Sequence, residues 1–138
     1  MYRVLVPVDN NVKRSMAQAR TVANFPSATD SVEVLLLYVF ENEDSLNPSS
    51  DESVRDPTNV ESVQQVTEYF DEQGIEYELR KDRHDAVEAI LDYDEDNDLD
   101  AIVMGGRKRS PGGKVVFGST SHSVLMNTDT PVMLTGGA

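Results

Sequence analysis

Short apolar runs alternate with segments of helical periodicity along the chain, and this alternation constrains the fold more than any other feature. The runs are rich in Val, Ile and Leu and are shorter than a buried helix, which is typical of strands. They predict five strands, at residues 2–8, 32–40, 75–80, 101–104 and 131–135. Between the strands, apolar residues at helical spacing predict helices over Val12–Ala23, over Val60–Phe70, after Asp85, and from Val116 or Phe117 to Met126.

Residues suited to helix ends lie where these segments begin and end. Asp9, Asn10 and Asn11 precede the first helical segment, and Asp85 precedes the third. Each of these residues has a side chain that can accept from free backbone N–H groups, so Asp9 could be an N-cap only. Pro26 is placed to end the first helix and Gly74 to end the second. The boundaries therefore agree with the periodicity.

The alternating order predicts an α/β fold, in which an open parallel sheet carries helices on both faces. Right-handed crossovers give the five predicted strands the order 3-2-1-4-5. A chain of 138 residues is long enough for one such Rossmann-like domain, residues 1–138. The strand order reverses between the first and fourth strands, which lead into Asp9 and Gly105, and open α/β sheets bind ligands at such a switch point.

The composition is strongly acidic. The chain has 25 acidic and 12 basic residues and a formal net charge of −13, which makes nucleic acid a poor partner. Halophiles use such acidity to stay soluble in salt, and we interpret the chain as salt-adapted, from a halophilic archaeon. It has no Cys, no signal-peptide pattern and no apolar run near the roughly 18 residues of a membrane span. We therefore expect a cytoplasmic protein without a membrane partner.

Two acidic segments carry no specific site. Residues 41–57 contain Ser, Asn and Pro and lack periodicity, so we expect a mobile loop there. Six acidic residues lie between Asp92 and Asp100, but Asn97 and Val103 stand where an EF-hand needs Gly and Glu. A solvated helix end is favoured, and no metal site is predicted.

A glycine-rich basic loop follows the fourth predicted strand. Four of the twelve basic residues lie within eight positions, namely Arg107, Lys108, Arg109 and Lys114. A strand, a Gly-rich loop and a helix start can present backbone N–H groups to an anion such as phosphate. The alternative is a solvated loop whose cations balance nearby carboxylates. A Walker A loop is excluded, because Lys108 and Val115 stand where it needs Gly and Ser or Thr.

This stretch resembles the nucleotide motif of the universal stress protein family, G-x2-G-x9-G-[ST]. Gly105, Gly118 and Ser119 occupy its first, third and last positions at the right spacing. Residues 4–9 resemble the family's first strand with its adenosine-contacting aspartate, and residues 37–39 resemble the end of its second strand, where a backbone group meets adenine. The closing helix and strand are also similar, so the resemblance covers essentially the whole chain.

The resemblance implies a stress-response protein with the adenine nucleotide alpha-hydrolase-like fold. It would bind ATP or AMP at the switch point between the first and fourth strands, with the presence of Mg²⁺ left open. Carried onto this sequence, the candidate contacts are Pro7, Val8, Asp9, Val39, Met104, Gly105, Arg107, Lys108, Gly118, Ser119 and Thr120.

One position departs from the family motif. Lys108 stands where the family motif has its second glycine. In the family, that glycine lets the backbone come close to the phosphates. A lysine reduces that freedom but adds a charge that could reach a phosphate. We therefore expect nucleotide binding to be weakened or altered at the phosphate end.

The last predicted strand, Pro131–Thr135, is apolar and would form an edge of the sheet. Such an edge exposes unpaired backbone groups that must be blunted, covered or paired. Pairing with a second copy would satisfy them, and the family's usual dimer forms through this strand. We therefore predict a homodimer.

The sequence leaves three functions open. The first is a nucleotide-binding sensor or chaperone-like module. The second is a dimeric interaction protein that has lost the ability to bind the nucleotide, and Lys108 is the residue that favours it. A slow ATP hydrolase or phosphotransferase is least favoured, because no paired base accompanies Ser119 or Ser121 in the local sequence. We expect a binding protein rather than an enzyme.

Overall fold

The computed structural model describes residues 1–40, 56–83, 85–106, 108–109, 111–113, 115–116 and 118–136. Its elements in chain order are β1 (Tyr2–Val8), α1 (Val12–Ala23), α2 (Ala28–Ser31), β2 (Val32–Phe40), the 3-10 helix η1 (Pro57–Asn59), α3 (Glu61–Gln73), β3 (Glu76–Arg83), α4 (Ala86–Asp96), β4 (Ala101–Met104), β5 (Lys108–Arg109), β6 (Val115–Val116), α5 (Ser119–Asn127) and β7 (Val132–Leu134).

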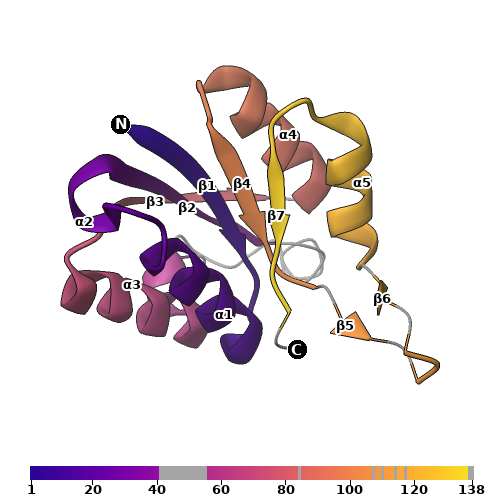
Figure 1. The fold of residues 1–138 in the computed structure, drawn as a ribbon, viewed down its shortest axis with the longest axis horizontal. Helices are drawn as coiled ribbons and strands as arrows, with labels where there is room; N and C mark the ends of the chain where they lie inside the picture. The colour runs from indigo at the N-terminus through magenta and orange to yellow at the C-terminus, as the bar shows by residue number, and fades with distance from the viewer. Residues whose placement is uncertain are drawn as a thin grey trace.

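Five parallel strands form one sheet in the order β3-β2-β1-β4-β7 (Figure 1). This confirms the predicted α/β fold and its 3-2-1-4-5 order, because β7 is the fifth strand that the sequence predicts. β1 is the central strand: Val4 pairs with Val34 of β2 on one side and with Ala101 of β4 on the other. The two edges of the sheet are β3 and β7.

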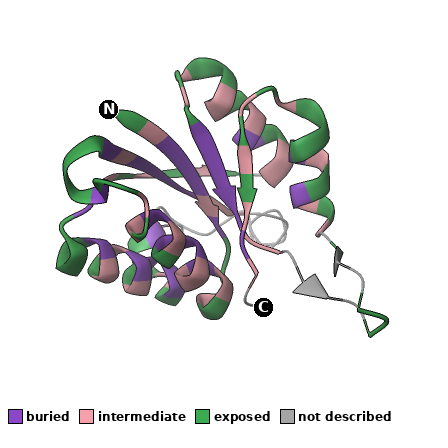
Figure 2. Ribbon diagram, viewed as in Figure 1, coloured by how far each residue is buried: buried purple, intermediate pink, exposed green. Residues whose placement is uncertain are grey.

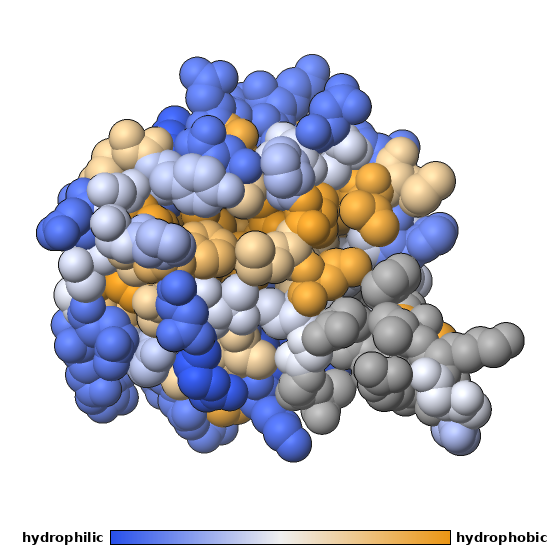
Figure 3. Space-filling view, in the orientation of Figure 1, coloured by the Kyte–Doolittle hydropathy of each residue, from blue (hydrophilic) through white to orange (hydrophobic). Residues whose placement is uncertain are grey.

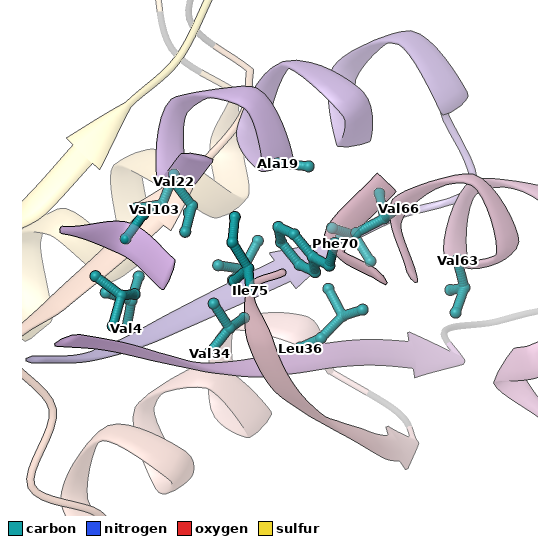
Figure 4. Packing of buried hydrophobic residues seen from close by; sticks show 14 residues of the cluster. Val4, Ala19, Val22, Val34, Leu36, Val63, Val66, Phe70, Ile75 and Val103 are labelled. Carbon is teal, nitrogen blue, oxygen red and sulfur yellow. The ribbon is translucent and has the colours of Figure 1, made fainter. Parts of the chain in front are cut away.

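Helices cover both faces of the sheet, with α1 and α3 on one side and α4 and α5 on the other (Figure 1). Successive residues of β1 point to opposite faces. Val4 belongs to the core cluster beneath α1 and α3, in which Phe70 is fully buried (Figure 4). Leu5 belongs to a second cluster with Ile90 of α4 and Val124 of α5. Burial is therefore concentrated in the central strands (Figure 2).

The predicted caps begin and end the helices. Asn11 Oδ1 accepts a hydrogen bond from Arg14 N at 2.8 Å, and Asp85 Oδ1 accepts one from Val87 N at 2.8 Å. Gly74, with φ +72°, ends α3 in the left-handed conformation that glycine adopts without a steric cost. The Asn11 cap therefore starts α1 at Val12, with residues 9–11 between it and the end of β1.

The last helix begins later than the sequence predicts. α5 begins at Ser119, with Gly118 as its N-cap, and not at Val116 or Phe117. Val115–Val116 instead pairs antiparallel with Lys108–Arg109, in a short ribbon that projects from the body in Figure 1. The two valines suit an extended backbone, and pairing across the ribbon supplies hydrogen bonds that an added helical turn would otherwise provide.

The third strand is shifted and longer than predicted. β3 spans Glu76–Arg83 instead of residues 75–80, because β2 offers a pairing partner along its whole length, as far as Phe40 opposite Arg83. Ile75 is instead buried in the loop that follows α3.

Most of the predicted loop at 41–57 lies outside the described residues. Only its last two residues are described, and residues 41–55 fall in the undescribed part. Asp56 Oδ1 accepts from Thr58 N at 2.9 Å, which caps η1, and Pro57 is buried. The end of this segment is therefore anchored where the chain enters α3.

Candidate functional site

The carboxyl ends of β1 and β4 lie beside the start of α5. Oγ of Ser121, in the first turn of α5, donates to the backbone O of Gly105 at 2.8 Å. A Cβ added to Gly106 would lie 3.8 Å from Gly118 N. The two ends of the predicted phosphate loop, Gly105–Gly106 and Gly118–Ser119, therefore come together.

The backbone in this part of the site is suited to an anion. Gly106 has φ +100°, a conformation that residues with a side chain rarely adopt. Gly118 is the N-cap of α5, so the first N–H groups of the helix have no acceptor within it. The nine-residue helix also places partial positive charge at this end.

Asp9, directly after β1, is held by neighbours on three sides. Asn11 N donates to its Oδ1 at 2.9 Å, and Arg14 Nη1 donates to its Oδ2 in an ion pair. The backbone O of Asp9 accepts from the hydroxyls of Ser15, at 3.1 Å, and Ser62, at 2.6 Å. Both serines are fully buried, whereas the Asp9 side chain is 50% exposed. α1 and α3 thus fix the backbone beneath an accessible carboxylate.

Gln18 of α1 connects β1 and β4 beyond their direct pairing. The described pairs between these strands reach only as far as Leu5 and Ile102. Further along, Nε2 of the buried Gln18 donates to Pro7 O at 2.7 Å and to Val103 O at 3.0 Å. The amide satisfies carbonyls that the separating strands can no longer satisfy for each other.

Arg14 lies between the two strand ends, and sequence reasoning missed it. A Cβ added to Gly105 would fall 2.3 Å from Arg14 Cγ, so the arginine stem packs directly on this glycine. Its Nε is buried and has no hydrogen-bond partner among the described residues. The available signal was its spacing, because Arg14 and Gln18 lie four residues apart and therefore on one helical face.

The predicted contacts on β1 and β2 lie at the same end of the sheet. Val8 pairs with Tyr38, and Val39 follows Tyr38 by one residue, so Val39 lies next to the end of β1. Val8 is buried in the core, and the backbone O of Pro7 accepts a hydrogen bond from Gln18. Asp9 is therefore the side chain of this group that is open to a ligand.

The remaining predicted contacts differ in how far the structure describes them. Met104 is buried, and its backbone O accepts from Thr135 N at 2.8 Å. Thr120 is half-buried in the first turn of α5. Arg107 lies outside the described residues, and of Lys108 only the backbone is described, so the predictions for these two cations stay predictions.

The described residues offer little to a metal or a membrane. No group of three or more His, Cys, Asp or Glu side chains in the described part of the chain could hold a metal ion. No helix there is long and apolar enough to cross a membrane. Among the described residues, the site presents a carboxylate, a guanidinium, hydroxyls and backbone groups.

A family model matches nearly the full length of the chain, and two sequence relatives match about half of it. A model of the Universal stress protein family matches residues 1–136. Universal stress protein Slr1230 of Synechocystis sp. is 32% identical over 79 residues, which is 57% of this chain and 28% of that protein. A universal stress protein of Mycolicibacterium smegmatis is 31% identical over 72 residues, 51% of this chain and 55% of that protein. The matches thus span about half of these relatives' length or less.

Solved structures superpose on almost the whole chain. The universal stress protein from Archaeoglobus fulgidus has a TM-score of 0.75 at 24% identity, covering 98% of both chains. The Archaeoglobus fulgidus protein in complex with dAMP has a TM-score of 0.71 at 19% identity, again covering 98% of both. A family protein from Arabidopsis thaliana with AMP bound has a TM-score of 0.67 at 18% identity, covering 100% of this chain and 93% of that one. At these identities the likeness shows the fold.

Proposed function

Because the chain belongs to the universal stress protein family, we propose that it binds an adenine nucleotide where β1, β4 and α5 meet. The observation that carries the proposal is the position of the half-exposed Asp9 carboxylate, linked through Arg14 to the turn at Gly105–Gly106. That turn lies beside the first N–H groups of α5. The dAMP and AMP complexes of two structural neighbours support the choice of ligand.

Each part of the site has a chemical role in this proposal. The Asp9 carboxylate accepts hydrogen bonds from the ribose hydroxyls, because an ionised carboxylate is only an acceptor. Backbone N–H groups of Gly105–Gly106 and of the first turn of α5, from Ser119, bind phosphate. Backbone groups at Val39 meet the adenine base. ATP and AMP both fit this scheme, and Mg²⁺ would accompany the triphosphate.

The proposed role is a nucleotide-dependent sensor or chaperone-like module in the stress response. The Ser121 hydroxyl already donates to the Gly105 carbonyl, so it serves the fold and not a reaction. Lys108 in place of the second motif glycine weakens or alters the contact with the terminal phosphates. Binding, rather than turnover, is therefore the activity to measure.

Removing the Asp9 side chain tests the nucleotide site. Asp9→Ala should weaken AMP and ATP binding in calorimetry at molar salt by about tenfold or more, since hydrogen bonds to a charged group contribute about 1.5–3 kcal/mol. Asp30→Ala, which removes an exposed carboxylate from α2, is the matched control and should bind like the parent. Equal binding by Asp9→Ala and the parent would refute the assignment.

We also propose a homodimer formed through β7, because the two edges of the sheet differ. β3 carries charged residues along most of its length, which discourages pairing with another chain. β7 has no charged residue and exposes Met133, which is 43% exposed. Figure 3 shows apolar surface over β7 and α5, where Leu125 and Met126 are also exposed. A second copy across a two-fold axis would cover this surface and pair the edge.

A charge on β7 tests the dimer. Met133→Lys should convert the dimer to a monomer in sedimentation velocity at tens of micromolar and high salt. Glu76→Lys adds a lysine to the opposite edge strand and should leave the dimer intact. A monomeric parent, or a dimeric Met133→Lys, would show that β7 is not the interface.

A further inference from the structure

The Arg14 side chain lies across the proposed nucleotide site. Its Cγ and Cδ cover Gly105, where an added Cβ would fall 2.3 and 2.7 Å from them. Its Nη1 donates to Oδ2 of Asp9. One side chain thus contacts both the carboxylate proposed to bind ribose and the glycine that begins the phosphate-binding turn.

The guanidinium of Arg14 is only partly satisfied in this position. Its Nε is buried and has no hydrogen-bond partner among the residues that the structure describes, which is unfavourable for a polar donor. The ion pair with Asp9 is accessible to water, with side-chain exposures of 28% and 50%, and such pairs contribute little net stability. A stronger partner could therefore draw the guanidinium away from Asp9.

A phosphate group is a partner of that kind. The guanidinium presents its donors in a planar fork that matches phosphate oxygens, and such pairs are frequently bidentate. A nucleotide in the proposed site offers a phosphate near Gly105 and ribose hydroxyls that need the Asp9 carboxylate. A nucleoside offers only the hydroxyls, and these meet an Asp9 Oδ2 that already accepts from the Arg14 guanidinium lying beside it.

We propose, building on the proposed nucleotide site, that Arg14 is a specificity-determining residue that makes the site select nucleotides over nucleosides. Without a phosphate, Arg14 pairs with Asp9 and hinders the binding of ribose. With a phosphate, the guanidinium moves from Asp9 to the phosphate and leaves the carboxylate free for the ribose. The ligand class that the site favours is therefore an adenine nucleotide with at least one phosphate.

Calorimetry with adenosine and AMP tests this role in the parent, Arg14→Met and Arg20→Met. Methionine keeps an unbranched stem over Gly105 but removes the charge and the donors. Arg20 is exposed in the last turn of the same helix, so Arg20→Met controls for the loss of one positive charge. Arg14→Met should bind adenosine more tightly and AMP more weakly, so that the preference for AMP falls about tenfold or more. Arg20→Met should keep the preference of the parent.

The outcomes separate this inference from the proposed function. If the parent binds AMP and Arg14→Met changes adenosine and AMP binding by the same factor, the selective role of Arg14 is overturned while nucleotide binding stands. If neither parent nor variant binds AMP, the proposed function fails and the role of Arg14 fails with it. Should Arg14→Met not fold, Arg14→Gln, also neutral, should show the same fall in AMP preference, and an unchanged preference overturns the inference.

Discussion

The two sides of the candidate site are built in different ways. On the side of β1 and α1, buried polar side chains hold the backbone, as Ser62 does at Asp9 O and Gln18 does at the carbonyls of two strands. On the side of β4 and α5, two glycines shape the backbone. Gly105 leaves room for the Arg14 stem, and Gly106 adopts φ +100°. The first side is fixed mainly by side-chain hydrogen bonds, and the second is shaped mainly by the space at its glycines, with one described side-chain hydrogen bond from Ser121 to Gly105 O.

This difference separates stability from ligand contact. A buried side chain that satisfies several backbone groups fixes one geometry, and its loss leaves those groups without partners. A glycine turn contributes space and backbone N–H donors. A side chain added at such a glycine would collide with the group that fills the space, which at Gly105 is the Arg14 stem. Loss of the Gln18 amide on the first side should therefore lower the free energy of unfolding most, and a side chain added at the glycines of the second side should act through steric contact.

Gln18→Leu should have the largest effect. Leucine fills a similar volume but leaves Pro7 O and Val103 O without the amide donor, which should lower the free energy of unfolding by about 2–4 kcal/mol. Urea unfolding at constant m-value measures the loss. Gln73→Leu, at an exposed position near the end of α3, is the control. A loss no larger than that of the control would show that the amide does not hold β1 and β4 together.

Gly105→Ala should have an intermediate effect that depends on Arg14. The added Cβ would fall 2.3 Å from Arg14 Cγ, an inner atom of the stem, and overpacking of this kind costs about 1–3 kcal/mol. Urea unfolding of Gly105→Ala alone and combined with Arg14→Ala forms a double-mutant cycle. The combination should recover most of the loss. An equal loss in both backgrounds would mean that the glycine does not serve to admit the arginine.

Ser121→Ala should have a small effect, and Ser62→Ala the smallest. Ser121 supplies the hydroxyl described at Gly105 O, and its removal should cost about 1 kcal/mol. Ser62 shares Asp9 O with Ser15, so one hydroxyl remains after the substitution. Thermal unfolding of the two variants compares them directly. A larger loss for Ser62→Ala would reverse the expected order.

The fold could be predicted from the sequence because its signals are local. Apolar runs and helical spacing mark the strands and helices, and right-handed crossovers restrict the sheet to a few orders, of which 3-2-1-4-5 is a common one. The main error, the start of α5, arose because Val116 continues an apolar pattern that suits a helix, whereas pairing with Lys108 draws it into a strand. That pairing joins residues across a loop and leaves no periodic signal.

The parts of the candidate site could be located from the sequence only where motif spacing indicated them, and their role in binding stays a prediction. Asp9, Gly105 and Gly118 follow from position and spacing, but Gln18 and Ser62 do not. Gln18 bonds to Val103, 85 residues away, and Ser62 to Asp9, 53 residues away, so a sequence shows only polar residues on amphipathic helices. Salt adaptation, an archaeal source and a cytoplasmic location stay predictions. They rest on the composition of the chain, and no contact within the fold tests them.

The central place of β1 in the sheet also affects how the protein is made. β1 leaves the ribosome before the other four strands of its sheet and can pair with β2 soon after β2 is made, but its other neighbour, β4, is made only after α3, β3 and α4. At roughly 5–20 residues per second, one side of a strand containing Val4 and Leu5 stays unpaired for several seconds in the nascent chain. Such an apolar strand edge is a site for wrong pairing between neighbouring nascent chains, and the arrival of β4 ends that exposure.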